Sequence, residues 1–271
     1  GGACTQFEVL TAAAFAALRD VGVEAAAIEA GLGGRLDATN VLQAPVVVLT
    51  GVALDHTEHL GDTREAIAGE KLAVLAPGAV LVAGGIDDEI EPVVQRLAAD
   101  RGAARALLLR PGALDADLPD LAAAGTFQRG NAALALGAAS ALLGDAFDAP
   151  RATAAVAAVQ VPGRLEVIAR YPLVLRDAAH NPDGAQTLAR DVPRAVRGAS
   201  PVVGVLALLA DKDVDGVLAA LAPVLDHVIA TATASDRALP AERLLAAAQR
   251  SRIPRTRWRG RVIAREAAAR S

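Results

Sequence analysis

The sequence predicts an α/β protein in which helices cover a layered, mostly parallel sheet, followed by a second, smaller α/β unit. Short apolar runs typical of buried strands alternate with alanine-rich runs typical of helices, and this alternation favours the class. Of the 271 residues 53% are hydrophobic but only 2% are aromatic, so Ala, Val and Leu must fill the core between the layers. The pattern restarts around residues 161–164, where a Pro-Gly pair predicts the boundary between the two units.

Strands and helices are expected to alternate in the first unit. Residues 46–50 contain only Val, Leu and Thr, which predicts a parallel strand covered on both faces. Residues 25–28 predict a buried strand that leads into a glycine-rich turn. Further strands are expected at 80–83 and 107–109, and helices at 7–20, 65–75, 130–143 (buried) and 150–159.

The second unit repeats this alternation over a shorter length. Strands are expected at 173–175, 202–206 and 228–231, and helices from 184, at 214–221 and at 240–249. The domains are therefore predicted as 1–160 and 161–271. Residues 250–271 are rich in Arg, and an exposed strand–helix pair is the preferred interpretation of them over a basic tail.

Composition excludes several classes of protein. Charged residues make up 21% of the chain and the formal net charge is −4, which argues against disorder and against a surface for nucleic acid. A single Cys excludes a disulfide framework and a cysteine zinc cage, and it suits a reducing compartment. No run is long and apolar enough for a membrane span, and the first residues do not resemble a signal peptide. We therefore expect a cytoplasmic protein with no membrane partner.

Three residue types are scarce. The sequence contains no Met, so we expect that it does not begin at a natural initiator. Its 27 basic residues include only two lysines, Lys71 and Lys212, and its only asparagines are Asn40, Asn131 and Asn181. A primary amine can be carbamylated or can act as a compact charge on phosphate, whereas a guanidinium serves differently. The two lysines are therefore candidate functional residues, with chance retention as the alternative.

A first polar cluster follows the predicted strand at 25–28 and has the sequence E-A-G-L-G-G-R-L-D-A-T-N, residues 29–40. A carboxylate just after a buried strand is typical of magnesium sites, because a hard cation prefers oxygen ligands. The glycines would let the backbone pass close to a ligand. A glycine-rich turn with a solvated Glu29 explains the same residues equally well.

Two more clusters follow predicted strands, the usual place for ligands in open α/β sheets. Residues 55–59 bring together two carboxylates and two imidazoles, which favours a functional site; zinc is disfavoured because no third His or Cys lies nearby. Asp177 and His180 sit three apart in a loop, where they could hold a ribose and a carboxylate or phosphate. A simple turn before a helix is the alternative. A serine hydrolase is a weaker option, because the chain has no G-x-S-x-G elbow.

Taken together, these segments resemble the folylpolyglutamate synthase and dihydrofolate synthase family of the Mur-ligase superfamily. The resemblance runs in order along almost the whole chain, and its most specific part is the string G-L-G-G-R-L-D-A-T-N. It implies a Mur-ligase-like fold whose second domain is Rossmann-like. The matching segments are T-Q-F-E at 5–8, 29–40, L-D-H-T at 54–57, L-G-D-T at 60–63, I-A-G-E-K at 67–71, Q-R-G-N-A at 128–132, P-G-R at 162–164, 177–182 and D-K-D at 211–213.

The resemblance implies an ATP-dependent amide ligase of folate biosynthesis and one-carbon metabolism. In this family a substrate carboxylate is phosphorylated, and the amino group of glutamate then attacks the acyl phosphate. The implied acceptor is dihydropteroate or a (tetrahydro)folate, and the implied cofactors are Mg²⁺ and ATP. By matching position, the resemblance assigns the metal to Glu29, His56 and carbamylated Lys71. It assigns ATP to Asn131, Arg164, Asp177 and His180, and His180 would also face glutamate. It assigns the pterin to Thr5, Phe7, Asp37 and Ala38.

The sequence also departs from the family. No G-x-x-x-x-G-K-[ST] phosphate loop occurs, so we expect that the 1–160 domain lacks that segment and that the chain alone has little or no ligase activity. The 161–271 glutamate-ligase domain is likewise expected to be incomplete. Ala178 stands where the family usually has Gly, and Leu72-Ala73 follow Lys71 in place of the usual Ala-Gly. The resemblance suggests a monomer.

Two alternatives stay open. One is a Mur-type amide ligase that acts on a cell-wall or other polyglutamate substrate. The other is a non-catalytic nucleotide- or folate-binding remnant. The pterin positions Phe7 and Asp37 favour the folate interpretation over the first of these.

Overall fold

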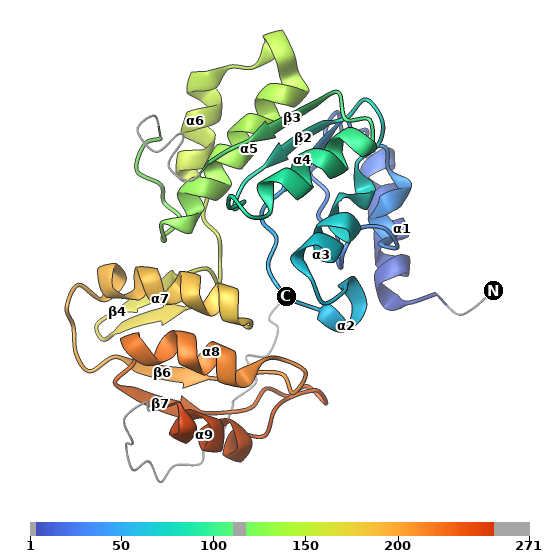
Figure 1. Cartoon of the computed structure of the whole chain (residues 1–271). Helices are drawn as coiled ribbons and strands as arrows, with labels where there is room; N and C mark the ends of the chain where they lie inside the picture. Colours follow the sequence, from blue (N-terminus) through green and yellow to red (C-terminus); the bar gives the residue numbers. More distant parts are fainter. Residues whose placement is uncertain (1–3, 111–117, 252–271) are drawn as a thin grey trace. The chain divides into compact units, whose positions relative to one another are not determined.

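The chain forms two compact units (Figure 1). The computed structural model describes residues 4–110 and 118–251. The first unit comprises residues 1–121 and 128–159, and the second comprises residues 122–127 and 160–271. The second unit is therefore built from two separate stretches of sequence. The strand–helix pair expected in the last stretch of the chain lies outside the described residues, apart from its first two positions.

A three-stranded parallel sheet forms the centre of the first unit. Its strand order is β1-β2-β3. All three strands overlap strands expected from the sequence, and β3 begins two residues earlier than expected. The strands are β1 (Val46–Leu49), β2 (Val80–Ala83) and β3 (Arg105–Leu108).

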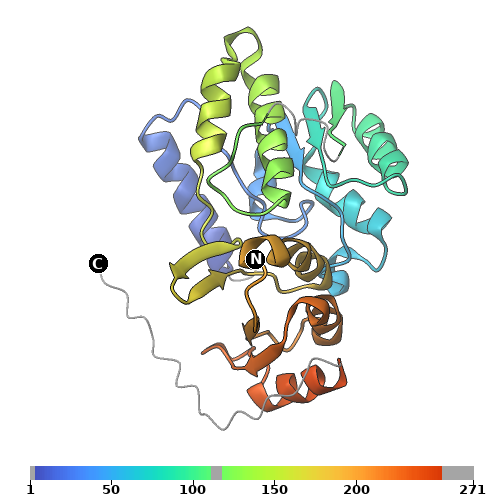
Figure 2. The same cartoon turned by 90° about the vertical axis from the view of Figure 1, so that its left-hand side faces the viewer.

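Helices cover both faces of this sheet (Figures 1 and 2). On one face, Leu81 and Ala83 of β2 belong to a core with Ile67 of α3 and Val94 of α4. On the other face Gly137 of α5 lies against Val82, where a Cβ on the glycine would stand 3.1 Å from a methyl carbon of the valine. The helices of this part of the chain are α1 (Gln6–Asp20), α2 (Thr57–Leu60), α3 (Arg64–Lys71), α4 (Glu91–Asp100), α5 (Phe127–Leu143) and α6 (Ala149–Ala158).

Three expectations for this unit are wrong. Residues 25–28 form no strand and are exposed, because no described strand pairs with them and an apolar run forms a strand only where a neighbour supplies hydrogen bonds. The strand β1 is not covered on both faces, since Val48 is 43% exposed. The helix α5 is buried only near its beginning, and its last residues, Leu142 and Leu143, are about half exposed.

The second unit combines an antiparallel hairpin with a small parallel sheet. The hairpin pairs β4 (Glu166–Arg170) with β5 (Leu173–Arg176), and β6 (Val203–Leu206) runs parallel to β7 (His227–Ala230). The strands β5, β6 and β7 confirm the sequence prediction, whereas β4 was not expected.

Three helices share one core in the second unit. Leu218 and Leu244 are completely buried there, together with Ala185. All three helices confirm expected ones, because their apolar residues recur on one face. They are α7 (Pro182–Val196), α8 (Val214–Leu221) and α9 (Ala241–Arg250).

A buried carboxylate joins the two sequence stretches of the second unit. Asp191 of α7 is only 2% exposed, and its Oδ2 accepts hydrogen bonds from the backbone N–H (2.8 Å) and the hydroxyl (3.1 Å) of Thr126. Hydrogen bonds to a charged acceptor are among the stronger ones in proteins. This contact holds Thr126 on α7, one residue before α5 begins.

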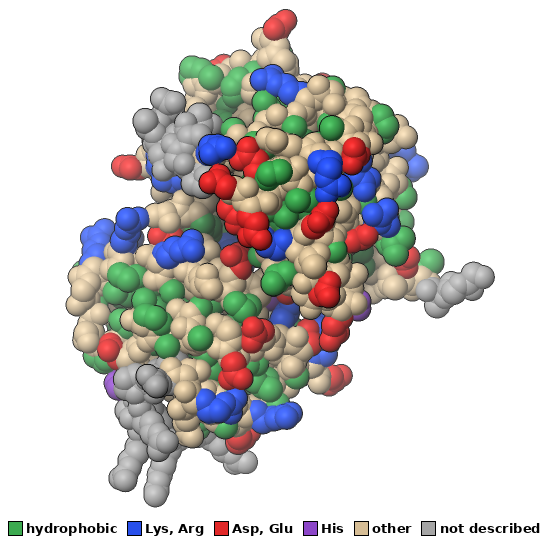
Figure 3. Space-filling view, in the orientation of Figure 1, with side chains coloured by type: hydrophobic (Ala, Val, Ile, Leu, Met, Phe, Trp, Pro, Cys, Tyr) green, Lys and Arg blue, Asp and Glu red, His purple; other side chains and the backbone are tan. Residues whose placement is uncertain are grey.

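Carboxylates accompany many of the arginines on the surface. In the first unit Arg64 pairs with Asp87 at 2.9 Å, Arg110 pairs with Glu91 at 3.0 Å, and Arg96 pairs with Glu65. Acidic and basic side chains are interspersed on the face drawn in Figure 3. Exposed ion pairs of this kind contribute little to stability, but they prevent these arginines from forming a basic patch. No helix among the described residues is long and apolar enough to cross a membrane.

Candidate functional site

The glycine-rich loop of residues 31–42 touches three helices, and it does so at a different glycine each time. A Cβ on Gly31 would lie 2.5 Å from the ring of Phe7 in α1, and one on Gly33 would lie 2.7 Å from Leu60 in α2. A Cβ on Gly34 would lie 2.6 Å from the backbone oxygen of Glu70, near the end of α3. A Cβ at Gly34 would clash with backbone, whereas one at Gly31 or Gly33 would displace a neighbouring side chain, and Gly33 also has a φ of +66°.

Asp37 holds this loop together. Its Oδ2 accepts hydrogen bonds from the backbone N–H groups of Gly31 and Leu32, both at 2.9 Å. Its Oδ1 accepts from the backbone N–H (3.0 Å) and the hydroxyl (2.6 Å) of Thr39. Partial burial raises the pKa of Asp37, but the hydrogen bonds from Thr39, Leu32 and Gly31 outweigh it and lower the pKa below its ordinary value. Ala38 begins the short 3-10 turn that follows.

The beginning of α1 lies beside the same loop. Thr5 caps the helix: its hydroxyl accepts from the backbone N–H of Glu8 at 3.2 Å, and the Glu8 carboxylate accepts from the backbone N–H of Thr5. The ring of Phe7, 43% exposed, then meets Gly31, whose N–H is bound by Asp37. The structure thus brings Phe7 and Asp37, two of the residues expected to bind the pterin, next to the same glycine.

The loop is also attached to the end of α3, where Lys71 is the last residue. The backbone N–H of Arg35 donates to the carbonyl of Glu70 at 3.2 Å, and the Arg35 Nε donates to the Glu70 carboxylate at 2.7 Å. The side chain of Asn40 donates to the carbonyl of Arg35 at 3.0 Å. The expected carbamate position is therefore adjacent in structure to the glycine-rich loop.

His56 lies just before α2 in a left-handed conformation, with φ of +51°. Its backbone N–H donates to the Asp55 carboxylate at 2.9 Å, and its Nε2 lies 3.8 Å from the other oxygen of that carboxylate. Glu29 is exposed on the extended segment before the glycine-rich loop. Within residues 4–110 and 118–251, no three His, Cys, Asp or Glu side chains group as a metal site.

The donor set expected for metal comprises a carboxylate from Glu29, an imidazole from His56 and, after carbamylation, a further pair of oxygens on Lys71. Oxygen-rich sets of this kind suit Mg²⁺ better than zinc. The chemistry of the residues fits magnesium, and their role as ligands stays a prediction.

Asn131, an expected ATP contact, lies one turn into α5. Its side-chain amide donates to Oε1 of Gln128 at 3.0 Å, and Gln128 is only 5% exposed. Arg129, between them, donates to the carbonyl of Leu118 at 2.9 Å. Hydrogen bonds therefore hold the polar side chains of the first turn of α5, whereas the residues that follow in the helix are mostly apolar.

In the second unit, Arg164 lies in a tight turn between two residues with positive φ. Gly163 has φ of +71° and Leu165 has φ of +46°. The N–H of Gly163 donates to Glu166 at 2.7 Å, and the N–H of Leu165 donates to Asp177 at 2.7 Å. A leucine in this conformation costs about 1–2 kcal/mol. Leu165 is 2% exposed, so burial of its side chain, worth about 1.5–3 kcal/mol, offsets that cost.

Glu166 stabilises the same turn from the beginning of β4. The hydrogen bond from Gly163 and the contact with Arg176 lower the pKa of its carboxyl below the ordinary value. Two carboxylates, one on each side of the turn, thus hold the backbone around Arg164.

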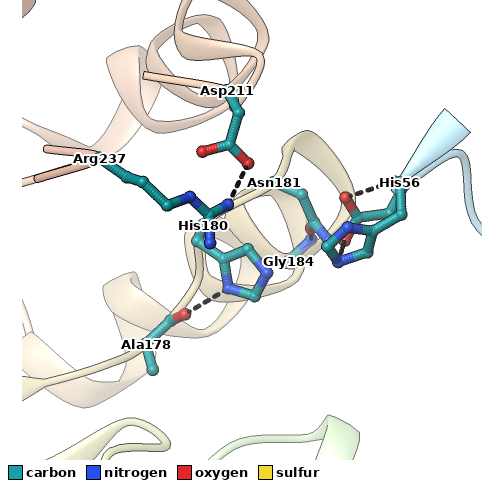
Figure 4. Close-up of polar contacts among 8 residues, drawn as sticks. His56, Ala178, His180, Asn181, Gly184, Asp211 and Arg237 are labelled. Atoms are coloured by element: carbon teal, nitrogen blue, oxygen red, sulfur yellow. Dashed lines mark hydrogen bonds and ion pairs between the residues drawn. The ribbon is translucent and has the colours of Figure 1, made fainter. Parts of the chain in front are cut away.

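Asp177, His180 and Asn181 come from one loop between β5 and α7. Figure 4 shows His180 and Asn181. The second oxygen of Asp177 accepts from the N–H of Ala179 at 2.7 Å. His180 is exposed, and its Nδ1 lies 3.0 Å from the carbonyl oxygen of Ala178, within hydrogen-bond distance for the tautomer that carries its proton on Nδ1. Asn181 caps α7 by accepting from the N–H of Gly184 at 2.8 Å.

The segment containing Lys212 follows β6 and lies beside the segment after β7. Asp211 pairs with Arg237 at 2.9 Å, and the N–H of Ala210 donates to the carbonyl of Arg237 at 2.9 Å (Figure 4). Partial burial raises the pKa of Asp211, but its own backbone N–H and the charges of Arg237 and Lys212 outweigh this and lower it. The next residue, Asp213, caps α8.

Two features had no signal in the sequence. Leucine is not a residue type associated with positive φ, so nothing marked Leu165 as special. Asp191 is a single acid in a helix, and such residues are usually solvated. Neither pattern distinguishes these two residues from ordinary ones.

The comparison with protein families identifies the class. Residues 163–271 match the family model described as "Mur ligase, glutamate ligase domain". Solved structures that resemble the chain include the Mycobacterium tuberculosis folylpolyglutamate synthase complexed with ADP and AMPPCP (TM-score 0.81, 38% identity, covering 92% of this chain and 61% of that one) and the Escherichia coli FolC in complex with DHPP and ADP (TM-score 0.81, 31% identity, 91% and 61%). The fold is that of a Mur-type ligase.

The chain is, more particularly, a homologue of the folylpolyglutamate and dihydrofolate synthases. It is 40% identical over 277 residues to the M. tuberculosis dihydrofolate synthase/folylpolyglutamate synthase and 33% identical over 255 residues to the E. coli protein of the same name. These matches cover 92% and 89% of the chain. The chain spans 57% and 59% of the length of these two relatives.

Proposed function

We propose that this chain carries the central and glutamate-ligating parts of an ATP-dependent acid–amino-acid ligase. The enzyme adds L-glutamate to dihydropteroate, to a (tetrahydro)folate, or to both. The first unit carries the pterin positions and Asn131 of the ATP set, and the second unit carries Arg164, Asp177 and His180 and takes part in glutamate addition. The identity of 40% over 92% of the chain to a protein named dihydrofolate synthase/folylpolyglutamate synthase supports this proposal.

Two contacts support the folate part of the proposal: that of Phe7 with Gly31, and that of Gly31 with Asp37. An exposed aromatic ring gives a flat pterin an apolar surface, and the adjoining loop offers polar groups to its edge. Because the Asp37 carboxylate also organises the loop, it positions the groups around the pterin as well as facing it. Thr5 and Ala38 complete this set at the beginnings of α1 and the 3-10 turn.

In the first step a carboxylate oxygen of the acceptor attacks the γ-phosphorus of ATP, which gives an acyl phosphate and ADP. Such phosphoryl transfer depends on positioning and charge neutralisation rather than on covalent help from the protein. Arg164 supplies a positive charge to the phosphates, Asn131 and Asp177 contact the nucleotide, and Asn131 is held in place by Gln128.

Magnesium, when bound, neutralises phosphate charge. Glu29, His56 and carbamylated Lys71 are the residues that would hold it, and titration of the chain with Mg²⁺ while the ring signals of His56 are followed by NMR tests that assignment. Carbamylation would turn Lys71 from a cation into an anion beside the glycine-rich loop.

In the second step the amino group of glutamate attacks the acyl carbon, phosphate leaves, and an amide forms with release of a proton. His180 faces this amino group. The contact of its Nδ1 with the Ala178 carbonyl holds the ring in the loop between β5 and α7. We further propose that the enzyme is a cytoplasmic monomer.

A glutamate-dependent ADP-release assay tests the function. The protein expressed from its natural gene is assayed with dihydropteroate and with tetrahydrofolate as acceptors, and the 271-residue chain is assayed beside it. We expect acceptor-dependent ADP release from the first, and little or none from the chain alone because it contains no phosphate-loop motif. Release that needs a cell-wall precursor would favour the other Mur-type activity, and nucleotide binding without turnover would indicate a remnant.

A further inference from the structure

We propose that Leu165 and Asp177 form a positioning pair that sets the direction of Arg164. This inference rests on the proposed function, because it is the ATP-binding role of Arg164 that gives the arrangement its use. The N–H of Leu165 donates to Oδ2 of Asp177 at 2.7 Å, and this bond joins the turn before β4 to the loop that follows β5. Neither residue needs to touch ATP to have this effect.

Leu165 adopts a conformation that leucine avoids, and two contacts retain it there. Its side chain is 2% exposed, so it cannot leave its site without exposing apolar surface. Its backbone N–H is bound by a carboxylate, which is a stronger acceptor than a carbonyl. With φ of +46° fixed at Leu165 and φ of +71° at Gly163, the backbone on both sides of Arg164 is determined.

Asp177 joins two segments through its two oxygens. Oδ2 binds the turn at Leu165, and Oδ1 accepts from the N–H of Ala179 at 2.7 Å, in the loop that carries His180. One carboxylate therefore fixes Arg164 and the His180 loop in a common frame within the second unit. The Asp177 carboxylate that would contact ATP is also the group whose two oxygens bind backbone N–H groups. The positioning role of Asp177 must therefore be separated from its contact with ATP by experiment.

Backbone amide hydrogen exchange in the 271-residue chain tests the contact without any ligand. Asp177→Asn removes the charge and should accelerate exchange at the amides of residues 165 and 179 at least tenfold, with a fall in the heteronuclear NOE at Arg164. The matched control is Asp183→Asn, which removes a carboxylate from the first turn of α7 that is exposed and outside this contact. Leu165→Gly keeps the bond to Asp177 but removes the buried side chain, so it should accelerate exchange at position 165 and leave position 179 unchanged.

A second measurement tests whether the pair acts through Arg164. ATP affinity is measured for Arg164→Lys, Leu165→Gly and the double variant. If Leu165 acts through Arg164, the loss in the double variant is no greater than that of Arg164→Lys alone. Independent, multiplicative losses would overturn the positioning role, as would unchanged exchange at position 165 in Asp177→Asn. If the protein expressed from its natural gene binds no ATP, the proposed function fails, and the exchange rates and NOE alone decide whether the pair holds Arg164.

Discussion

The tip of the Phe7 ring points at the α-carbon of Gly31: a Cβ there would stand 2.5 Å from Cζ and 2.9 Å from each Cε carbon. The two residues lie 24 positions apart in sequence, one in α1 and the other in the glycine-rich loop. The contact makes the position of the ring dependent on the absence of a side chain at residue 31.

Gly31→Ala should therefore displace the Phe7 ring. We expect a loss of dihydropteroate affinity of at least tenfold with only a small fall in Tm, because the half-exposed ring can rotate away from the added methyl group. Titration with dihydropteroate and thermal unfolding measure the two effects. Gly69→Ala in α3 is the control, since a Cβ there meets nothing within 4 Å. Equal affinities in the two variants would remove Phe7 from the pterin site.

Gly34→Ala should destabilise the chain more than Gly31→Ala does. Its Cβ would stand 2.6 Å and 2.8 Å from the carbonyl oxygens of Glu70 and Lys71, and backbone atoms cannot rotate away as a ring can. We expect a loss of about 2–3 kcal/mol in the free energy of unfolding, measured with urea. Gly69→Ala should instead be neutral or stabilising by up to about 1 kcal/mol, because it improves helix propensity at an open position.

Asp37→Asn should lower stability in a pH-dependent manner. The pKa of Asp37 is lowered in the folded chain, so its contribution is present above the unfolded value of 3.8 and is lost as the pH falls through the folded pKa. We expect the variant to be less stable by about 1–3 kcal/mol at pH 7, with a difference that narrows toward pH 3. Urea unfolding at both pH values measures it. Asp145→Asn, an exposed carboxylate, should change stability by less than about 0.5 kcal/mol.

Carbamylation of Lys71 can be tested by replacing each of the two lysines of the chain in turn. After incubation with ¹³C-bicarbonate, we expect a carbamate carbonyl signal from Lys71 in the ¹³C NMR spectrum of the protein expressed from its natural gene. Lys71→Arg should abolish the signal and the ligase activity, while Lys212→Arg should keep the signal. A signal that disappears with Lys212→Arg instead would assign the modification to the other lysine.

Periodicity in the sequence predicted most of the fold correctly, and its errors over residues 25–28 and β4 both concern the pairing of strands. Helices such as α8 were predicted to the residue, because a stripe of apolar residues at helical spacing has one good way to be buried. Residues 25–28 have the composition of a strand, but a strand exists only with a hydrogen-bonded neighbour, which composition does not report. The strand β4 was missed for the opposite reason. Its sequence, E-V-I-A-R, has only a weak strand pattern, but the residues form a strand because β5 supplies a hydrogen-bonded neighbour.

The site could be predicted as a set of residues but not as a set of contacts. The string at 29–40 marked Asp37, and the structure adds that both of its oxygens bind the loop itself. Arg164 was marked by its motif, whereas the buried, left-handed Leu165 beside it was not, because backbone conformation at a leucine leaves no trace in a single sequence. Motifs identify the residues that meet a ligand more readily than those that hold such residues in place.

The attachment of Thr126 to Asp191 has a consequence for dissecting the molecule. A fragment that starts at residue 160 would contain every helix of the second unit, yet it would leave the Asp191 carboxylate, 2% exposed, without the two donors it binds. A buried charge that loses its partner costs several kcal/mol, a large share of the stability of a small domain. A fragment designed to fold as the second unit must therefore include residues 122–127 as well as the residues from 160 onward.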